Sequence, residues 1–217
     1  MIEIDTDRLR LRQWCAADRE PFAALNADPT VMEFFPALLS RAESDSMAAC
    51  CEGLVAERGW GLWAVETRNG REFIGLVGLH AVAPELPISP GIEISWRLAA
   101  RHWGNGYATE AARSALGIGF TQLHFPEIVA FTAVGNSRSR AVMERIGMRN
   151  TEATFEHPNV PVGSALRAHC LYRLTRAQWE ANGASRVRAG LTKQRLDTQF
   201  CVSCHDWYPP ADLAHAT

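Results

Sequence analysis

Long apolar runs are missing from this sequence, and none approaches the ~18 residues that would span a bilayer. The first five residues also lack the positive charge that a signal peptide needs, since they carry Glu3 and Asp5 instead. We therefore expect a cytoplasmic protein with no membrane partner. Runs of Lys and Arg are equally scarce and the formal net charge is −2, so a nucleic-acid surface is not expected either.

Stabilising disulfides are also not needed in a chain of this size. The 217 residues are 47% hydrophobic and 21% charged, which is ordinary for one globular domain with a small appendage. Because such a chain can bury a core without covalent cross-links, we expect reduced thiols at four dispersed cysteines. These are Cys15, Cys50, Cys51 and Cys170.

The composition changes from Asn182 onward to Gly, Ser, Arg and Lys, so we separate a domain of residues 1–183 from a tail of residues 184–217. The tail contains Cys201-x-x-Cys204-His205, the attachment formula of haem c, but that chemistry belongs to exported proteins. These residues, with His215, are of the types that bind zinc, but the sequence has no second Cys-x-x-Cys or spaced His pair to complete a tetrahedral site. An inert or packing tail is the third interpretation, and we assign no metal site.

The first third of the chain alternates between strand and helix patterns. Residues 6–14 alternate arginines with leucines, as in a half-buried strand whose charged face either serves solubility or meets a substrate. The apolar spacing of residues 18–35 predicts two short helices, and residues 40–58 predict a third. Two apolar runs, 61–66 and 73–79, flank Asn69-Gly70 and predict an antiparallel hairpin.

A strand, a glycine loop and a helix follow at the centre of the chain. Residues 91–98 form a strand-like run, Gly104-Asn105-Gly106 follows, and a helix period begins at Ala108. Glycines at such a joint let backbone N–H groups and the positive end of the helix meet one anion, although a bare turn without a ligand fits the same pattern. No Lys-Ser/Thr follows the loop and Thr109 stands where a third glycine would be, so the pattern disfavours a nucleoside-triphosphate or dinucleotide loop.

A second strand and helix follow at residues 127–134 and 136–148. Asn136 or Ser137 suits the helix cap, and Gly147 suits the left-handed residue that ends the helix. A capped helix with a glycine stop requires no ligand by itself. Residues 151–155 and 168–174 predict two more strands, and Thr175 caps a terminal helix.

These motifs together resemble the GNAT superfamily of N-acetyltransferases from about Thr6 to about Glu180. Residues 103–108, Trp-Gly-Asn-Gly-Tyr-Ala, resemble the family's pyrophosphate loop, Arg/Gln-x-x-Gly-x-Gly/Ala, and we assign Trp103 to its first position. Residues 136–148 are similar to the second cofactor motif. The opening strand and Trp-Gly-x-Gly-Tyr-Ala-Thr-Glu-Ala look like the branch of ribosomal-protein-alanine N-acetyltransferases (RimJ/RimL-like).

The resemblance implies an α/β (α+β) domain with a mixed, mostly antiparallel sheet of about six to seven strands, flanked by helices and splayed between its central parallel strands. It implies transfer of an acetyl group from acetyl-CoA to a primary amine by direct attack in a ternary complex. A protein N-terminal amine is the favoured acceptor, a small amine is the other, and a homodimer is a possible assembly. From a different class, a CoA-binding regulatory or interaction module with lost catalysis also fits.

The resemblance also assigns the cofactor-binding residues. The strand carrying Trp96, Arg97 and Leu98 would lie beside the pantetheine arm. The loop and helix start would hold the pyrophosphate, and Asn136 with Ser139 would lean toward the pantetheine. The loop residues are Trp103, Gly104, Asn105, Gly106, Tyr107, Ala108 and Thr109.

Two catalytic residues are expected. Glu93 lies three residues before Trp96 on the same strand, which would approach the acceptor, and it is the candidate base, acting directly or through water. A half-exposed strand carboxylate in an ordinary ion pair would explain it equally well. Many relatives place an acidic Tyr where this chain has Met143, so Ser139 or a bound water would protonate the leaving thiolate. An acyl-cysteine at Cys170 is the alternative route, but a single strand cysteine more often packs as a small apolar side chain.

Overall fold

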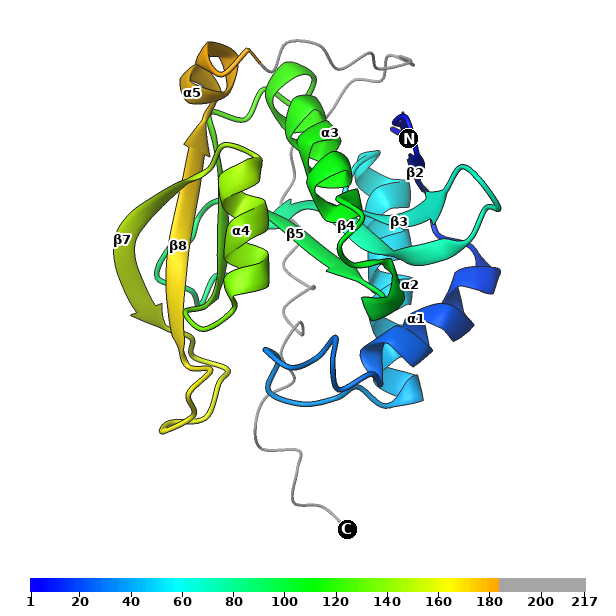
Figure 1. Cartoon of the computed structure of the whole chain (residues 1–217), viewed down its shortest axis with the longest axis horizontal. Coiled ribbons are helices and arrows are strands. Elements are labelled where there is room, and N and C mark those ends of the chain that lie inside the picture. Colours follow the sequence, from blue (N-terminus) through cyan, green and yellow to red (C-terminus); the bar gives the residue numbers. More distant parts are fainter. Residues whose placement is uncertain (184–217) are drawn as a thin grey trace.

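The structure, a computed structural model, describes residues 1–183 of the chain (Figure 1). The predicted zinc and haem ligands of the tail lie outside the described residues. The elements in chain order are β1 (Ile4–Asp5), β2 (Leu9–Arg12), a 3-10 turn (Ala16–Asp18), α1 (Arg19–Asn26), α2 (Arg41–Arg58), β3 (Leu62–Thr67), β4 (Phe73–Ala81), β5 (Ile92–Leu98), a second 3-10 turn (Ala100–His102), α3 (Tyr107–Thr121), β6 (Glu127–Ala133), α4 (Ser137–Arg145), β7 (Arg149–Glu156), β8 (Ala168–Thr175) and α5 (Arg176–Ala181).

The strands form one mixed sheet of eight in the order β1-β2-β3-β4-β5-β6-β8-β7. The mostly antiparallel, helix-flanked architecture is confirmed, and the predicted hairpin is the β3–β4 pair. The sheet has one strand more than expected because β1 is only two residues long, too short to show alternation in the sequence. The second short helix expected before residue 35 is wrong, since residues 29–34 form turns, in which Thr30 N–H donates to Asp28 Oδ1.

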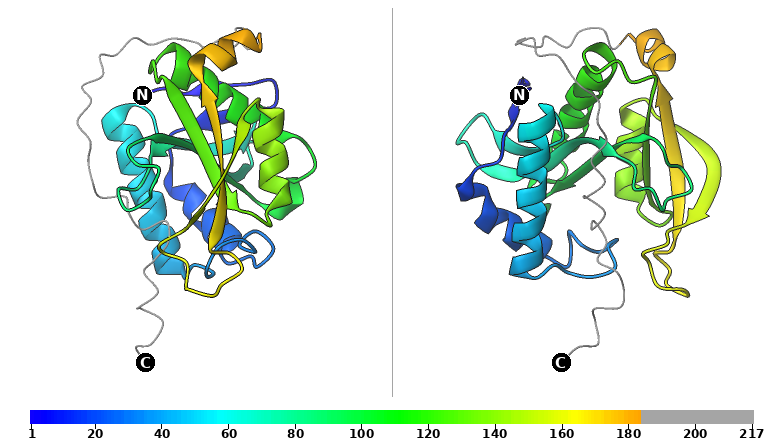
Figure 2. Two further views of the ribbon diagram at one scale, coloured as in Figure 1. Left: turned by 90° about the vertical axis from the view of Figure 1, so that its left-hand side faces the viewer. Right: turned by 180° about the vertical axis from the view of Figure 1, so that it is seen from behind.

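The helices cover both faces of the sheet. Helix α3 packs on β4 and β5, and α4 packs on β6 and β7. Helices α1 and α2 lie on the opposite face, as the view from behind shows (Figure 2). Helix α3 follows β5 after the second 3-10 turn and the glycine loop, and α4 follows β6 after a short turn, so both helices begin beyond the carboxyl ends of these neighbouring strands.

The helix boundaries follow from their end residues. Ser40 and Glu43 form a capping box at the start of α2, and Gly59 ends it in the left-handed conformation. Asn136 caps α4 by accepting a bond from Ser139 N–H, and Gly147 has a φ of +89°, so both expectations for this helix are confirmed. Thr175 caps α5 as expected.

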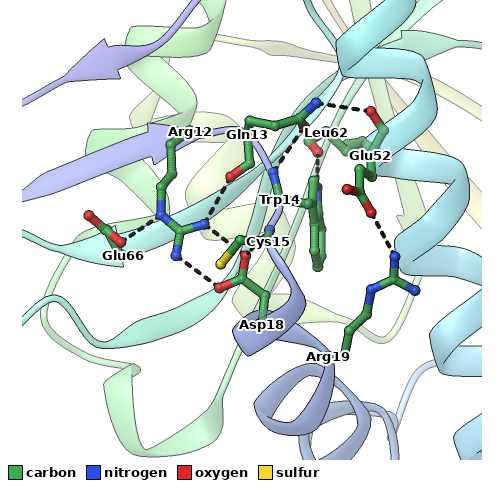
Figure 3. Close-up of polar contacts among 9 residues, drawn as sticks. All are labelled: Arg12, Gln13, Trp14, Cys15, Asp18, Arg19, Glu52, Leu62 and Glu66. Atoms are coloured by element: carbon green, nitrogen blue, oxygen red, sulfur yellow. Dashed lines mark hydrogen bonds and ion pairs between the residues drawn. The ribbon is translucent and has the colours of Figure 1, made fainter.

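A buried ion network ties β2 to the rest of the domain (Figure 3). Arg12 donates two hydrogen bonds to Asp18, at 2.7 and 2.8 Å, and a third to Glu66 at 2.6 Å. Asp18 is 1% exposed. Arg12 therefore has a structural role, whereas Arg10 pairs with Glu3 at the surface.

The membrane and cysteine expectations have different outcomes. Within residues 1–183, no helix combines the length and apolar character needed to cross a membrane. Cys15, Cys51 and Cys170 are free thiols, as expected. Cys50 is disulfide-bonded, so the expectation of a reduced thiol is wrong at that position.

Candidate active site

A cleft opens where β5 and β6 separate. These parallel strands are in register at one pair only, Glu93 and Val129, in the described part of the chain. Beyond Glu93 the strands diverge, and a cavity of about 870 Å³ lies between them. All of the predicted site residues except Asn105 line it: Glu93, Trp96, Arg97, Leu98, Trp103, Gly104, Gly106, Tyr107, Ala108, Thr109, Asn136 and Ser139.

The glycine loop presents the start of α3 to this cleft. Gly104 and Gly106 have φ values of +77° and +79°, and Gly106 is the N-cap of α3, without a side-chain cap bond. An added Cβ would meet no atom within 4 Å at Gly104 and only an Arg8 nitrogen, at 3.5 Å, at Gly106. Backbone conformation, not crowding, therefore requires glycine here. The first N–H groups of a helix have no acceptor within the helix, so this end can hold an anion such as a diphosphate.

The first position of the loop motif needs a correction. Three residues before Gly104 stands Arg101, so the assignment of Trp103 to that position is wrong, and the spacing itself could have shown this. The Arg101 side chain is 61% exposed and pairs with Glu72 at 2.8 Å. Trp103 instead donates from Nε1 to the carbonyl of Leu98 at 2.8 Å, which fixes the loop against the end of β5.

Two further arginines approach the loop, and the sequence analysis missed both. Arg8 donates to the carbonyl of Asn105 at 2.9 Å and also binds Glu110. The guanidinium of Arg138 lies 4.8 Å from the centre of the Trp103 ring and pairs with Glu33. Both come from elements remote from the loop in sequence, so local spacing could not predict them.

Strand β5 turns different side chains to its two faces. Ile94 and Leu98 belong to the same core cluster as α3, and Trp96 packs against that cluster. Arg97 points to the other face, where its Nη1 donates to Asn26 Oδ1 at 2.6 Å and its guanidinium lies 4.1 Å from the centre of the Phe35 ring. The Arg97 side chain therefore contacts α1 and the loop after it. The edge of β5 beyond Glu93 is not paired with β6 and borders the cleft.

Glu93 is buried, with 8% of its surface exposed. Its Oε1 accepts from Ser95 Oγ at 2.7 Å, and its Oε2 lies 3.3 Å from His80 Nε2. Burial raises the pKa of Glu93 to about 8, although the Ser95 hydrogen bond acts in the opposite direction. Burial lowers the pKa of His80 to about 4. The half-exposed carboxylate in an ordinary ion pair, which was the alternative for Glu93, does not describe this arrangement.

The start of α4 forms the other wall. Asn136 accepts from Ser139 N–H at 3.1 Å and donates to Thr132 Oγ1 at 3.0 Å, so both ends of its amide hold the helix cap. Ser139 is half-buried and lines the cleft. Met143 is 1% exposed and has no proton to donate.

Comparison with known proteins places these features in context. The family model described as an acetyltransferase (GNAT) domain matches residues 8–149. The protein YkkB of Bacillus subtilis is 36% identical over 72% of this chain and 90% of its own length. The FsC-acetyl coenzyme A-N(2)-transacetylase of Aspergillus fumigatus is 28% identical over 81% of this chain and 77% of its own.

Other similar proteins include a relative described as a putative ribosomal N-acetyltransferase. This protein, YdaF of Bacillus subtilis, is 29% identical over 49% of this chain and 55% of its own length. Among solved structures, a GNAT-family acetyltransferase from Bacillus anthracis superimposes with a TM-score of 0.68 at 24% identity, covering 81% of this chain and 99% of its own. This last likeness concerns the fold.

Proposed function

Since the chain belongs to the GNAT acetyltransferase family and uses acetyl-CoA, we propose that it acetylates a primary amine by direct attack in a ternary complex, with a protein N-terminal amine as the favoured acceptor. The observation that carries this proposal is that one cleft contains both the anion-binding start of α3 and a buried carboxyl, Glu93. The first can hold the cofactor and the second can take a proton from the acceptor.

The cofactor would be held mainly by backbone groups. The residues from Trp103 to Thr109 would bind the pyrophosphate through N–H groups and the positive end of α3. The edge of β5 at Trp96, Arg97 and Leu98 would receive the pantetheine amides as a neighbouring strand would. Asn136 and Ser139 would contact the arm from α4. Bound in this way, acetyl-CoA supplies a thioester that an amine can attack.

Glu93 would be the general base. An ammonium acceptor must lose a proton before its nitrogen can attack, and a base works best when its pKa lies near the working pH. The raised pKa of Glu93, about 8, brings a carboxyl into the range where it can take that proton and still release it. A carboxyl at its ordinary value near 4.5 would be a far weaker base.

The leaving thiolate needs a proton, and Ser139 or a water beside it would supply this proton. Met143 cannot do so. An acyl-enzyme on Cys170 is disfavoured because this thiol is buried, its pKa is raised by burial, and it contacts the carbonyl of Thr132 at 3.5 Å.

The choice of acceptor depends on weaker similarities than the choice of reaction. The branch resemblance and the name of YdaF favour a protein N-terminus, while the name of the fungal transacetylase, which specifies an N(2) position, favours a small amine as the second candidate. Rings of Phe34, Phe35 and Phe131 line the cleft and would pack against the acceptor in either case.

A panel of acceptors tests the proposal. CoA release from acetyl-CoA would be followed with short peptides bearing free N-termini, with the same peptides blocked at the N-terminus, and with small amines such as polyamines. We expect turnover with free but not blocked peptides. Turnover only with small amines would support the second candidate, and tight acetyl-CoA binding without turnover of any amine would leave the regulatory CoA-binding module.

A further inference from the structure

Strands β4 and β5 bring a histidine directly opposite the candidate base. His80 and Glu93 are cross-strand partners in the antiparallel register, and Ser95 follows two residues along the same face of β5. The three polar ends meet: Ser95 Oγ lies 2.7 Å from Glu93 Oε1 and 3.0 Å from His80 Nε2, which lies 3.3 Å from Glu93 Oε2. All three residues line the cleft. Neither His80 nor Ser95 belongs to a motif that the sequence alone reveals.

The hydrogen-bonding groups of this cluster require one more hydrogen, between His80 Nε2 and Glu93 Oε2. His80 Nδ1 faces the carbonyl of Ala81 at 3.0 Å, and a carbonyl only accepts, so Nδ1 carries a hydrogen. In a neutral imidazole Nε2 is then an acceptor. The Ser95 hydroxyl gives its hydrogen to Glu93 Oε1. Nε2 of His80 and Oε2 of an ionised Glu93 would therefore be two acceptors facing each other, and a proton between them resolves this.

We propose that Glu93 and His80 share a single proton, and that His80, together with Ser95, is a positioning residue that makes the pair rather than Glu93 alone the proton acceptor of the reaction. This inference rests on the proposed role of Glu93 in acetyl transfer. It goes further because it gives His80, on the neighbouring strand β4, a role in holding the proton that Glu93 accepts.

Burial of the pair favours its neutral form, in which the shared proton lies between the Glu93 carboxyl and a neutral His80 imidazole. Burial disfavours both a carboxylate and an imidazolium here, because it raises the pKa of Glu93 to about 8 and lowers that of His80 to about 4. On the same face of β5, Arg97 binds Asn26. The other ionisable groups that line the cleft are Glu85, His102, Tyr107, Arg138, Arg145 and His157, from the loop before β5, the glycine loop and α3, α4, and the segment between β7 and β8.

The shared proton sets the order of proton movements. Once the pair has lost it, the Glu93 carboxylate takes a proton from the acceptor ammonium and restores the neutral pair. The free amine attacks, a C–N bond forms, the C–S bond breaks, and a second proton from the same nitrogen reaches the leaving sulfur. The pair then releases its proton to solvent, which balances the reaction of one ammonium and one thioester to one amide, one thiol and one proton.

Titration of the free enzyme by NMR tests the sharing without any acceptor. Carbon-labelled glutamate would report the Glu93 carboxyl, assigned with Glu93→Gln, and nitrogen-labelled histidine would report His80. We expect the carboxyl to titrate near pH 8, with His80 Nε2 changing over the same range and Nδ1 keeping its hydrogen. A Glu93 carboxyl titrating near its ordinary 4.5, or a His80 ring titrating independently near 6.5, would overturn the proposal.

The variant His80→Gln sharpens the test. An amide can donate a hydrogen bond to the carboxylate but cannot take up its proton, so the Glu93 midpoint should fall by about one pH unit, a tenfold change in proton affinity. The acidic limb of kcat/KM should move by the same amount, with the Kd for acetyl-CoA within about a factor of two. An unmoved midpoint in a folded variant would contradict the proposal.

The matched control is His169→Gln, which alters another buried histidine whose Nδ1 contacts the carbonyl of Arg167 on the far half of the sheet. It should leave the Glu93 midpoint in place, and a shift equal to that of His80→Gln would contradict the proposal by showing a general effect. If the titrations behave as expected but no amine is acetylated, the shared proton stands and the proposed function fails.

Discussion

Gly106 is the residue on which cofactor binding should depend most. Its φ of +79° is strained for any β-branched side chain, so Gly106→Val should shift the loop and move the N–H groups at the start of α3 away from the pyrophosphate. We expect acetyl-CoA affinity to fall by about 2 kcal/mol or more, roughly thirtyfold, as measured by calorimetry.

Gly70 provides the control for this change. It has a φ of +94° in the hairpin between β3 and β4, with no atom within 4 Å of an added Cβ. Gly70→Val should therefore carry a similar backbone strain and leave acetyl-CoA affinity unchanged. Equal affinity of the folded Gly106→Val variant and the control would argue against the loop as the pyrophosphate site.

Glu93 should also affect stability in a way that depends on pH. Its folded pKa, about 8, lies above the ordinary value of 4.5, so its contribution to stability is fully present below pH 4.5 and is lost as pH rises toward 8. Glu93→Gln cannot ionise and does not incur this loss. Relative to the wild type, the variant should gain up to about 1.4 kcal/mol of unfolding free energy per pH unit between pH 5 and 8.

Denaturant unfolding at several pH values measures this difference. His80 acts in the opposite direction, since its lowered pKa makes it lose stability as pH falls from 6.5 toward 4, so the comparison is cleanest between pH 6.5 and 8, above that range. A constant difference between variant and wild type from pH 5 to 8 would show that Glu93 is not held protonated.

At the scale of elements, β2 depends on the Arg12 network. Burial opposes ionisation of Asp18, but the hydrogen bonds from Arg12 and from the Cys15 N–H outweigh it and lower the pKa of the carboxyl. Arg12→Met would leave two buried carboxyls, Asp18 and Glu66, without their cation. The expected loss of unfolding free energy is about 3 to 5 kcal/mol.

The neighbouring Arg10 gives a control on the same strand. Its pair with Glu3 is exposed, so Arg10→Met should cost about 1 kcal/mol or less in the same denaturant experiment. Similar losses for the two variants would mean that burial of the Arg12 network contributes little.

Elements and loops that depend on local chemistry could be predicted from the sequence. The glycine loop, the Asn136 cap and the Asn69-Gly70 hairpin each depend on backbone preferences of a few adjacent residues, and the structure has all three. The pairing of His80 with Glu93 could not be predicted, because the proline-rich loop between β4 and β5 leaves their register open. The ion pair of Arg12 with Asp18 could not be predicted either. The alternating pattern shows which face of β2 carries Arg12, but not which carboxylate binds it.

At the scale of the whole molecule, we propose that residues 1–183 form the complete acetyltransferase domain and residues 184–217 a separate tail. Trp179 of α5 is buried, and its ring lies 5.5 Å from that of Phe120 on α3, so the last helix belongs to the core. With both proteins kept under reducing conditions, a chain ending at Gly183 should unfold cooperatively and bind acetyl-CoA as the full chain does.

A chain ending at Thr175 is the matched comparison, because it removes Trp179 and exposes Phe120. It should be less stable by about 3 kcal/mol or more. Loss of acetyl-CoA binding by the chain that ends at Gly183 would mean that part of the functional domain lies in residues 184–217.

The central claim, that Glu93 takes the proton of an amine in the same cleft that binds acetyl-CoA, is tested most directly by measuring turnover and cofactor affinity together in Glu93→Gln. With an acceptor identified from the panel, kcat should fall by about 100-fold or more, while the Kd for acetyl-CoA stays within about a factor of two. A variant with unchanged kcat, or one whose only change is a higher KM for the acceptor, would contradict the account.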